Sequence, residues 1–204
     1  MHRKYILRKV IFIMLLLLSP SIGFGFEIFA LGTSNTNCKD AGQAFTNTLN
    51  ELLAQDKING TVINAGVDGD RPVFMLDRLK QGFLKYPNIK LVLFEPGPNE
   101  KNPRFNLGSS EEILGYLRSN KIPTIFISNR SIQPEDAEAK QFTEKHDAYY
   151  YGHWARNIPG DSEHWSNRHM TAKACILWAN NLFPLIKQVV KERKDRKSTR
   201  LNSS

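Results

Sequence analysis

The sequence has 204 residues, of which 41% are hydrophobic and 24% are charged, as in an ordinary globular protein of one domain. These proportions exclude a disordered, fibrous or repetitive protein. The formal charge of +8 collects at the two ends, because without residues 1–25 and 195–204 the chain keeps 21 basic and 19 acidic side chains, a net charge of +2. Such a balanced body gives no electrostatic reason to expect a nucleic-acid partner.

Residues 1–25 have the pattern of an export signal. Four basic residues precede an apolar run at 11–18, and small residues follow at Gly23 and Gly25. We expect cleavage after Gly23 or Gly25, which leaves an exported protein, periplasmic or secreted, without a stable membrane span. A retained N-terminal membrane anchor is the alternative, although the run is shorter than the roughly 20 residues of a membrane helix.

Residues 195–204 (DRKSTRLNSS) form a basic tail. They resemble the in-frame translation of a common sequencing adapter, so we expect the tail to be non-native or disordered and the domain to span residues 26–194. Two cysteines lie in this domain, Cys38 and Cys175. They can pair in an oxidising compartment if their Cα atoms come within about 7 Å, which the sequence leaves open.

Short apolar runs alternate with longer helical patterns along the body. The expected strands are 27–31, 61–65, 90–95, 124–128 and 148–151, and the expected helices are 43–53, 72–86, 111–119, 134–145 and 170–190. Ser109 or Ser110 is expected to cap the third helix, and Pro184 to bend the last one. The alternation predicts an α/β fold, a three-layer α/β/α sandwich around a mostly parallel, flavodoxin-like sheet of about five strands.

In such sheets, ligands bind beyond the carboxyl ends of the strands. The first expected strand is followed by Gly32, Thr33 and Ser34, a tight turn on which a serine hydroxyl can act as nucleophile beside backbone N–H groups. The alternative is an ordinary helix cap. The second strand is followed by Gly66, which suits close approach of the backbone to a ligand, or a plain turn.

Two further segments add candidate catalytic groups. Asn99 follows the third strand on a proline-rich loop and can direct its amide at developing negative charge, although such a composition is also typical of a simple turn. Asp161 and His164 lie three residues apart before the last helix. In that arrangement the histidine can act as general base, and the carboxylate can orient its ring.

Taken together and in order, these four segments resemble the SGNH (GDSL-like) hydrolase superfamily. The second segment, residues 62–70 (VINAGVDGD), is the best match, and the spacing from residue 77 to Asn99 also follows the family. The resemblance covers about residues 28–190 and is strongest to the bacterial periplasmic thioesterase/lysophospholipase branch.

The resemblance implies a serine esterase of lipase type that cleaves carboxylic ester or thioester bonds through an acyl-enzyme. Its catalytic triad is Ser34, Asp161 and His164, and its oxyanion hole is formed by the backbone N–H groups of Ser34 and Gly66 with the Asn99 side chain. The implied substrates are small acyl esters, lysophospholipids or acylated glycans, and we expect a monomer without cofactor or metal.

The sequence departs from the family pattern at two motifs. Thr33 occupies the place of the family's aspartate before the serine, and Glu100 replaces the aspartate after Asn99. Two alternatives stay open, the first because export would place the protein beside cell-envelope polymers and the second because of these departures. One is an O-acetylesterase or acyltransferase that acts on cell-envelope polysaccharide, with aromatic side chains at 149–151 and Trp154 lining the cleft. The other is a non-catalytic binding module on a hydrolase fold.

Overall fold

The computed structural model describes residues 25–38, 40–99, 106–129 and 135–202. The expected export signal lies, except for Gly25, outside these residues. The strands are β1 (Phe26–Gly32), β2 (Gly60–Gly66), β3 (Ile89–Phe94), β4 (Thr124–Ser128), β5 (Tyr149–His153), β6 (Trp165–Ser166) and β7 (His169–Met170). The helices are α2 (Ser34–Asn37), α3 (Ala44–Gln55), α4 (Pro72–Lys85), α5 (Asn106–Ser119), α6 (Glu135–Lys145) and α7 (Ala172–Asn202).

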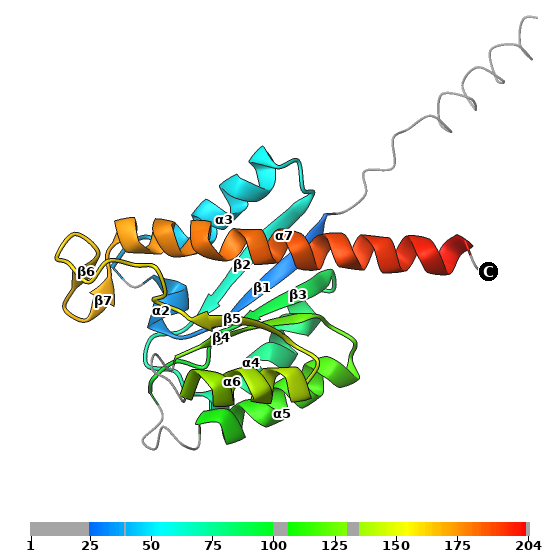
Figure 1. Cartoon of the computed structure of the whole chain (residues 1–204), viewed down its shortest axis with the longest axis horizontal. Coiled ribbons are helices and arrows are strands. Elements are labelled where there is room, and N and C mark those ends of the chain that lie inside the picture. Colours follow the sequence, from blue (N-terminus) through cyan, green and yellow to red (C-terminus); the bar gives the residue numbers. More distant parts are fainter. Residues whose placement is uncertain (1–24, 39, 100–105, 130–134, 203–204) are drawn as a thin grey trace, which may run out of the picture.

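Five parallel strands form one sheet in the order β2-β1-β3-β4-β5. Helices α3 and α7 cover one face of the sheet, and α4, α5 and α6 cover the other (Figure 1). This is the predicted three-layer sandwich. The strand order changes direction between β1 and β3, and the carboxyl ends of these two strands therefore flank the crevice where such sheets bind ligands.

The core consists of two apolar layers, one on each face of the sheet. Successive residues of a strand point to opposite faces, so Ile28 of β1 belongs to the layer under α3 and α7, whereas Phe29 belongs to the layer under α4 and α5. The largest buried side chain in the first layer is Trp178, which stacks on Phe45 with ring centroids 4.0 Å apart.

Some predicted boundaries were wrong. Helix α5 begins at Asn106 because Leu107, one turn before the predicted start, also packs against the core. Ser109 and Ser110 therefore lie inside the helix and do not cap it. Met170 lies in the small hairpin β6–β7, where it pairs with Trp165, and not in the last helix.

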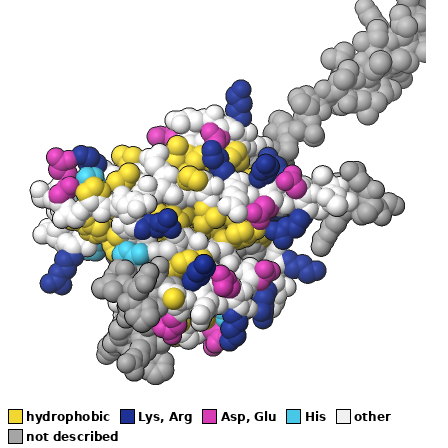
Figure 2. Space-filling model, in the orientation of Figure 1, with side chains coloured by type: hydrophobic (Ala, Val, Ile, Leu, Met, Phe, Trp, Pro, Cys, Tyr) yellow, Lys and Arg dark blue, Asp and Glu magenta, His cyan; other side chains and the backbone are white. Residues whose placement is uncertain are grey.

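Helix α7 contains Pro184 and continues to Asn202, so most of the tail extends this helix. Adding a residue to an existing helix costs far less than starting a new one, which accounts for the extension into a polar segment. The origin of the tail stays a prediction. Among the described helices, none combines the length and the hydrophobicity needed to cross a membrane. Basic and acidic side chains are interspersed over the face seen in Figure 2.

Candidate functional site: a serine turn and an Asp–His pair

The turn after β1 places Ser34 at the start of a short helix. Thr33 is the N-cap of α2 in an extended conformation, and its Oγ1 accepts a hydrogen bond of 3.4 Å from the backbone N–H of Asn35. Ser34 is the first helical residue and is half-buried. Its backbone N–H lies in the first turn of a helix, where N–H groups have no partner within the helix and can bind an external oxygen.

Three glycines lie against this turn: one ends β1, one ends β2 and one follows β3. A Cβ atom on Gly32 would lie 2.0 Å from Thr36 Oγ1, one on Gly66 would lie 2.3 Å from the backbone nitrogen of Asn37, and one on Gly97 would lie 2.1 Å from Thr33 Cγ2. Side chains at these positions would displace the turn. Gly66, which was predicted from the sequence to allow close approach of the backbone to a ligand, therefore approaches the serine turn itself.

A buried carboxyl group lies beneath the turn. Glu95 follows β3, has no exposed surface, and accepts hydrogen bonds from the Thr33 N–H at 2.9 Å and from the Thr33 hydroxyl at 2.9 Å. Thr36 Oγ1 lies 3.1 Å from the same carboxylate oxygen, and Asn35 Nδ2 lies 3.4 Å from the other one. Burial raises the pKa of Glu95, while these hydrogen bonds act in the opposite direction. No role for Glu95 was predicted from the sequence.

Asp161 and His164 form a hydrogen-bonded pair, as their spacing predicts. His164 Nδ1 lies 2.6 Å from Asp161 Oδ1, and the same oxygen accepts the backbone N–H groups of Glu163 and His164 at 3.0 and 3.2 Å. The hydrogen bond with His164 lowers the pKa of the Asp161 carboxyl. With Nδ1 donating to Asp161, the imidazole Nε2 is the ring atom that can take up a proton. The His164 side chain is buried, whereas that of Asp161 is half-exposed.

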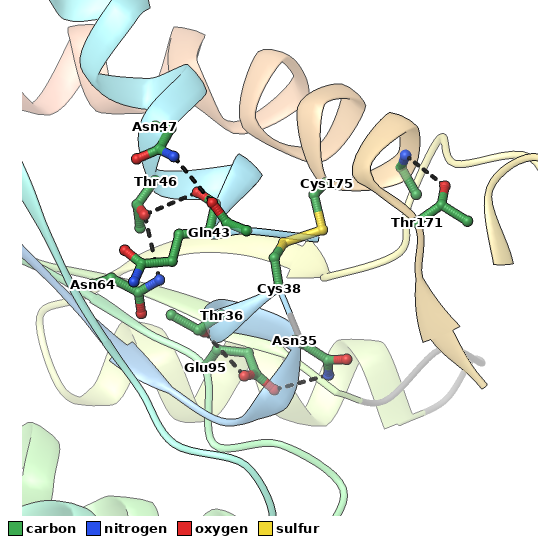
Figure 3. The surroundings of a disulfide bond; sticks show 12 residues. Asn35, Thr36, Cys38, Gln43, Thr46, Asn47, Asn64, Glu95, Thr171 and Cys175 are labelled. Carbon is green, nitrogen blue, oxygen red and sulfur yellow. Dashed lines mark hydrogen bonds between the residues drawn. A yellow bond between two sulfur atoms is a disulfide. The ribbon is translucent and has the colours of Figure 1, made fainter. Parts of the chain in front are cut away.

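Two contacts join the serine turn (residues 32–36) to the segment that carries Asp161 and His164 (residues 161–165), called here the histidine segment. Helix α2 contacts strand β7, which follows His164 in the chain. A disulfide also links Cys38, the C-cap of α2, to Cys175 in the first turn of α7, with the Cα atoms 6.4 Å apart (Figure 3). Thr171 completes the connection, because its N–H donates to the His164 carbonyl and its carbonyl accepts the Cys175 N–H, each at 3.0 Å.

The predicted oxyanion donors are partly engaged within the protein. The Gly66 N–H donates to Asn64 Oδ1 at 2.9 Å, so it would have to exchange this bond to reach a substrate. Asn99 donates one amide hydrogen to the Asp70 carbonyl at 2.9 Å, which orients the side chain and leaves its second hydrogen for a ligand. The oxyanion hole stays a prediction.

Arg78 of α4 stabilises the carboxyl ends of β1 and β2, a role that was not predicted from the sequence. Its guanidinium donates to the Gly32 carbonyl at 3.1 Å, to the Ala65 carbonyl, and to the Asp70 carboxylate. Arginine suits such a task because its five donors form a fixed fork. The ends of β1 and β2 and the loop beyond β2 are thereby held together.

The aromatic side chains considered for a glycan cleft lie in different places. The Tyr149 hydroxyl donates to Glu192 at 2.6 Å, Tyr150 packs against the core beneath α4–α6, and Tyr151 is buried beneath Arg156. Trp154 alone of the four lies beside the histidine segment, with its ring 5.4 Å from that of Trp165 in an edge-to-face contact.

The described residues hold no group of three or more His, Cys, Asp or Glu side chains that could bind a metal ion.

A cavity of about 650 Å³ lies at the amino ends of the strands, opposite to the serine turn. Its lining includes Thr124 and Tyr149, the first residues of β4 and β5.

The fold matches solved structures over nearly their whole length. The esterase EstA from Pseudoalteromonas sp., solved with monoethylphosphonate as inhibitor, has a TM-score of 0.70 and 19% identity, covering 81% of this chain and 98% of EstA. TesA gives a TM-score of 0.70 at 16% identity over 79% of this chain and 98% of its own. AlinE4, an SGNH-hydrolase family esterase, gives 0.64 at 22% identity over 83% of this chain and 98% of its own.

This chain has the SGNH hydrolase fold. No protein-family model matches its sequence, and a search of curated proteins gave no match. The shared fold confirms the predicted architecture and topology, whereas the roles of individual residues depend on the local geometry.

Proposed function

We propose that this chain hydrolyses carboxylic ester or thioester bonds through an acyl-enzyme on Ser34. The observation that carries the proposal is the Asp161–His164 hydrogen bond on a segment that the disulfide and Thr171 join to the Ser34 helix. A nucleophile, a base and a group that orients the base are the parts that acyl transfer requires. The SGNH fold, shared with the esterases EstA and AlinE4, supports the same reaction class.

In the proposed reaction, the Ser34 hydroxyl attacks the acyl carbon while its proton moves to His164 Nε2. The negative charge that develops on the carbonyl oxygen is bound by the backbone N–H of Ser34 and the second amide hydrogen of Asn99. His164 then delivers its proton to the departing alkoxide or thiolate. A water molecule repeats the sequence on the acyl-enzyme, with His164 again accepting a proton, and releases the carboxylic acid and free Ser34.

Asp161 supports this sequence in two ways. As the acceptor of the Nδ1 hydrogen, it keeps His164 in the tautomer whose Nε2 is unprotonated, and its negative charge stabilises the imidazolium that forms in each half-reaction. The lowered pKa of Asp161 keeps this carboxylate ionised under mildly acidic conditions.

We further propose that the substrate is a small acyl ester and that the protein acts outside the cytoplasm, as the export signal and the disulfide suggest. A glycan cleft built from the consecutive tyrosines has less support, because Tyr149 and Tyr151 are engaged within the protein.

The test is the initial rate of hydrolysis of p-nitrophenyl acetate, butyrate and octanoate by the chain and by its Ser34→Ala variant. We expect activity that falls to background in the variant, and the order of the three rates then defines the preferred acyl length. Equal rates in the two proteins would contradict the proposal. No activity in either folded protein would favour the non-catalytic binding module.

A further inference from the structure

Glu95 is a buried carboxyl group for which the proposed reaction has no use. A carboxyl without any exposed surface is costly to bury unless hydrogen bonds compensate for the lost water. Its partners Thr33, Asn35 and Thr36 belong to one turn and lie on both sides of Ser34 in the sequence. In Figure 3 the Glu95 side chain points towards Asn35 and Thr36.

The contacts reach both the backbone and the side chains of this turn. The Thr33 N–H fixes the residue before the nucleophile, and the Thr36 hydroxyl fixes the residue two positions after it. Both bonds end on the same oxygen, Glu95 Oε2. Because Glu95 is itself anchored to β1 through its backbone N–H, which donates to the Leu31 carbonyl at 2.9 Å, the turn is held against the end of the sheet.

We propose that Glu95 is a positioning residue for the esterase reaction. Its carboxylate fixes the turn from Thr33 to Thr36 so that the hydroxyl and the backbone N–H of Ser34 face the same substrate carbonyl. This inference rests on the proposed role of Ser34 and adds to it, since Glu95 acts through Ser34 and does not touch the substrate.

A positioning role for Glu95 accounts for the departure at residue 33. The resemblance places an acidic side chain directly before the nucleophile. This chain has Thr33 there, and the carboxylate that accepts the Thr33 hydroxyl belongs to Glu95. Thr33 Oγ1 and Glu95 Oε2 lie 2.9 Å apart. An aspartate at residue 33 beside a glutamine at residue 95 would reverse donor and acceptor and keep the hydrogen bond.

The first variants are Glu95→Gln, the double variant Thr33→Asp/Glu95→Gln, and the control Glu27→Gln. The control removes a half-buried carboxylate that accepts the Asn88 N–H at 3.2 Å at the opposite end of the sheet. In the Glu95→Gln variant we expect kcat for p-nitrophenyl butyrate to fall about 10²-fold with little change in KM, the effect of displacing a reacting group by about 1 Å. The double variant should recover at least about tenfold of this loss, and the control should keep the wild-type kcat.

A second, milder variant tests the proposal even if the Glu95→Gln variant does not fold. Thr36→Val is nearly isosteric and removes one donor to Glu95, and we expect kcat to fall about five- to tenfold, as for the loss of one hydrogen bond. Unchanged kcat in Thr36→Val, or in folded Glu95→Gln, overturns the inference and leaves the proposed function standing. A wild-type chain that hydrolyses no ester and does not react with a fluorophosphonate contradicts both.

Discussion

The disulfide between Cys38 and Cys175 closes a loop with a sequence separation of 137 residues. Cross-linking a loop of this length lowers the entropy of the unfolded chain by an amount worth about 5 kcal/mol at 25 °C, and measured values for disulfides run from about 2 to 5 kcal/mol. We expect the double variant Cys38→Ala/Cys175→Ala to lose stability within this measured range, without leaving a free thiol in the core.

Urea unfolding measures this loss as a difference in the free energy of unfolding. Reduction of the wild-type disulfide is the matched control and should shift the urea midpoint in the same direction as the double substitution. A loss below about 1 kcal/mol would refute the reasoning, because the cross-link would then not restrict the unfolded chain as the loop length requires.

The same disulfide predicts an effect on catalysis. It fixes the end of the Ser34 helix to the first turn of α7, and Thr171 connects that turn to His164. At a temperature where both proteins are folded, the double alanine variant should therefore show a lower kcat with a smaller change in KM. An unchanged kcat would mean that packing alone holds the two segments in place.

Further predictions concern single residues. Replacing Gly66 by alanine should lower the free energy of unfolding by about 1–3 kcal/mol and lower kcat, because the new Cβ would lie 2.3 Å from a backbone nitrogen of α2. Gly115→Ala, where the new Cβ would meet open space on α5, should instead raise the free energy of unfolding by up to about 1 kcal/mol, seen as a higher urea midpoint. Asp161→Asn should lower kcat by about 10²–10⁴-fold, since the amide no longer selects the His164 tautomer, and steady-state rates that match the wild type would exclude this role. Burial raises the pKa of Glu95 above its ordinary value of 4.5, so the native state holds its proton more tightly than the unfolded state. The free energy of unfolding should accordingly fall as the pH rises from about 4.5 through the raised pKa, and urea midpoints of Glu95→Gln should lack this part of the pH dependence.

The sequence predicts the architecture well because the strongest signals are long and periodic. The helix at Pro72–Lys85 and the strand at Thr124–Ser128 are each bounded by clear changes in pattern, and their alternation determines the sheet. The four-residue helix at Ser34 and the hairpin at Trp165–Met170 have too few residues for periodicity, and therefore the sequence does not predict them.

The candidate site is predictable only where its residues adjoin the strand ends or each other. Asp161 and His164 are three residues apart, and the structure brings them into contact. Glu95 was missed as part of the site because its side-chain partners are 59–62 residues away along the chain. Arg78 was missed because two of its three partners are backbone carbonyls, which leave no signal in the sequence, and the third, Asp70, lies eight residues away in a loop. A glutamate at the end of an apolar strand was the one available signal for Glu95, since a charged side chain is rarely fully buried without partners.

The most direct test of the central claim is covalent labelling of the chain by a fluorophosphonate, followed by mass spectrometry of its peptides. We predict one adduct, on the peptide that contains Ser34, formed much more slowly in the His164→Ala variant. No adduct on the folded wild-type chain, or an adduct on another serine such as Ser162, would contradict the assignment of Ser34 as the nucleophile.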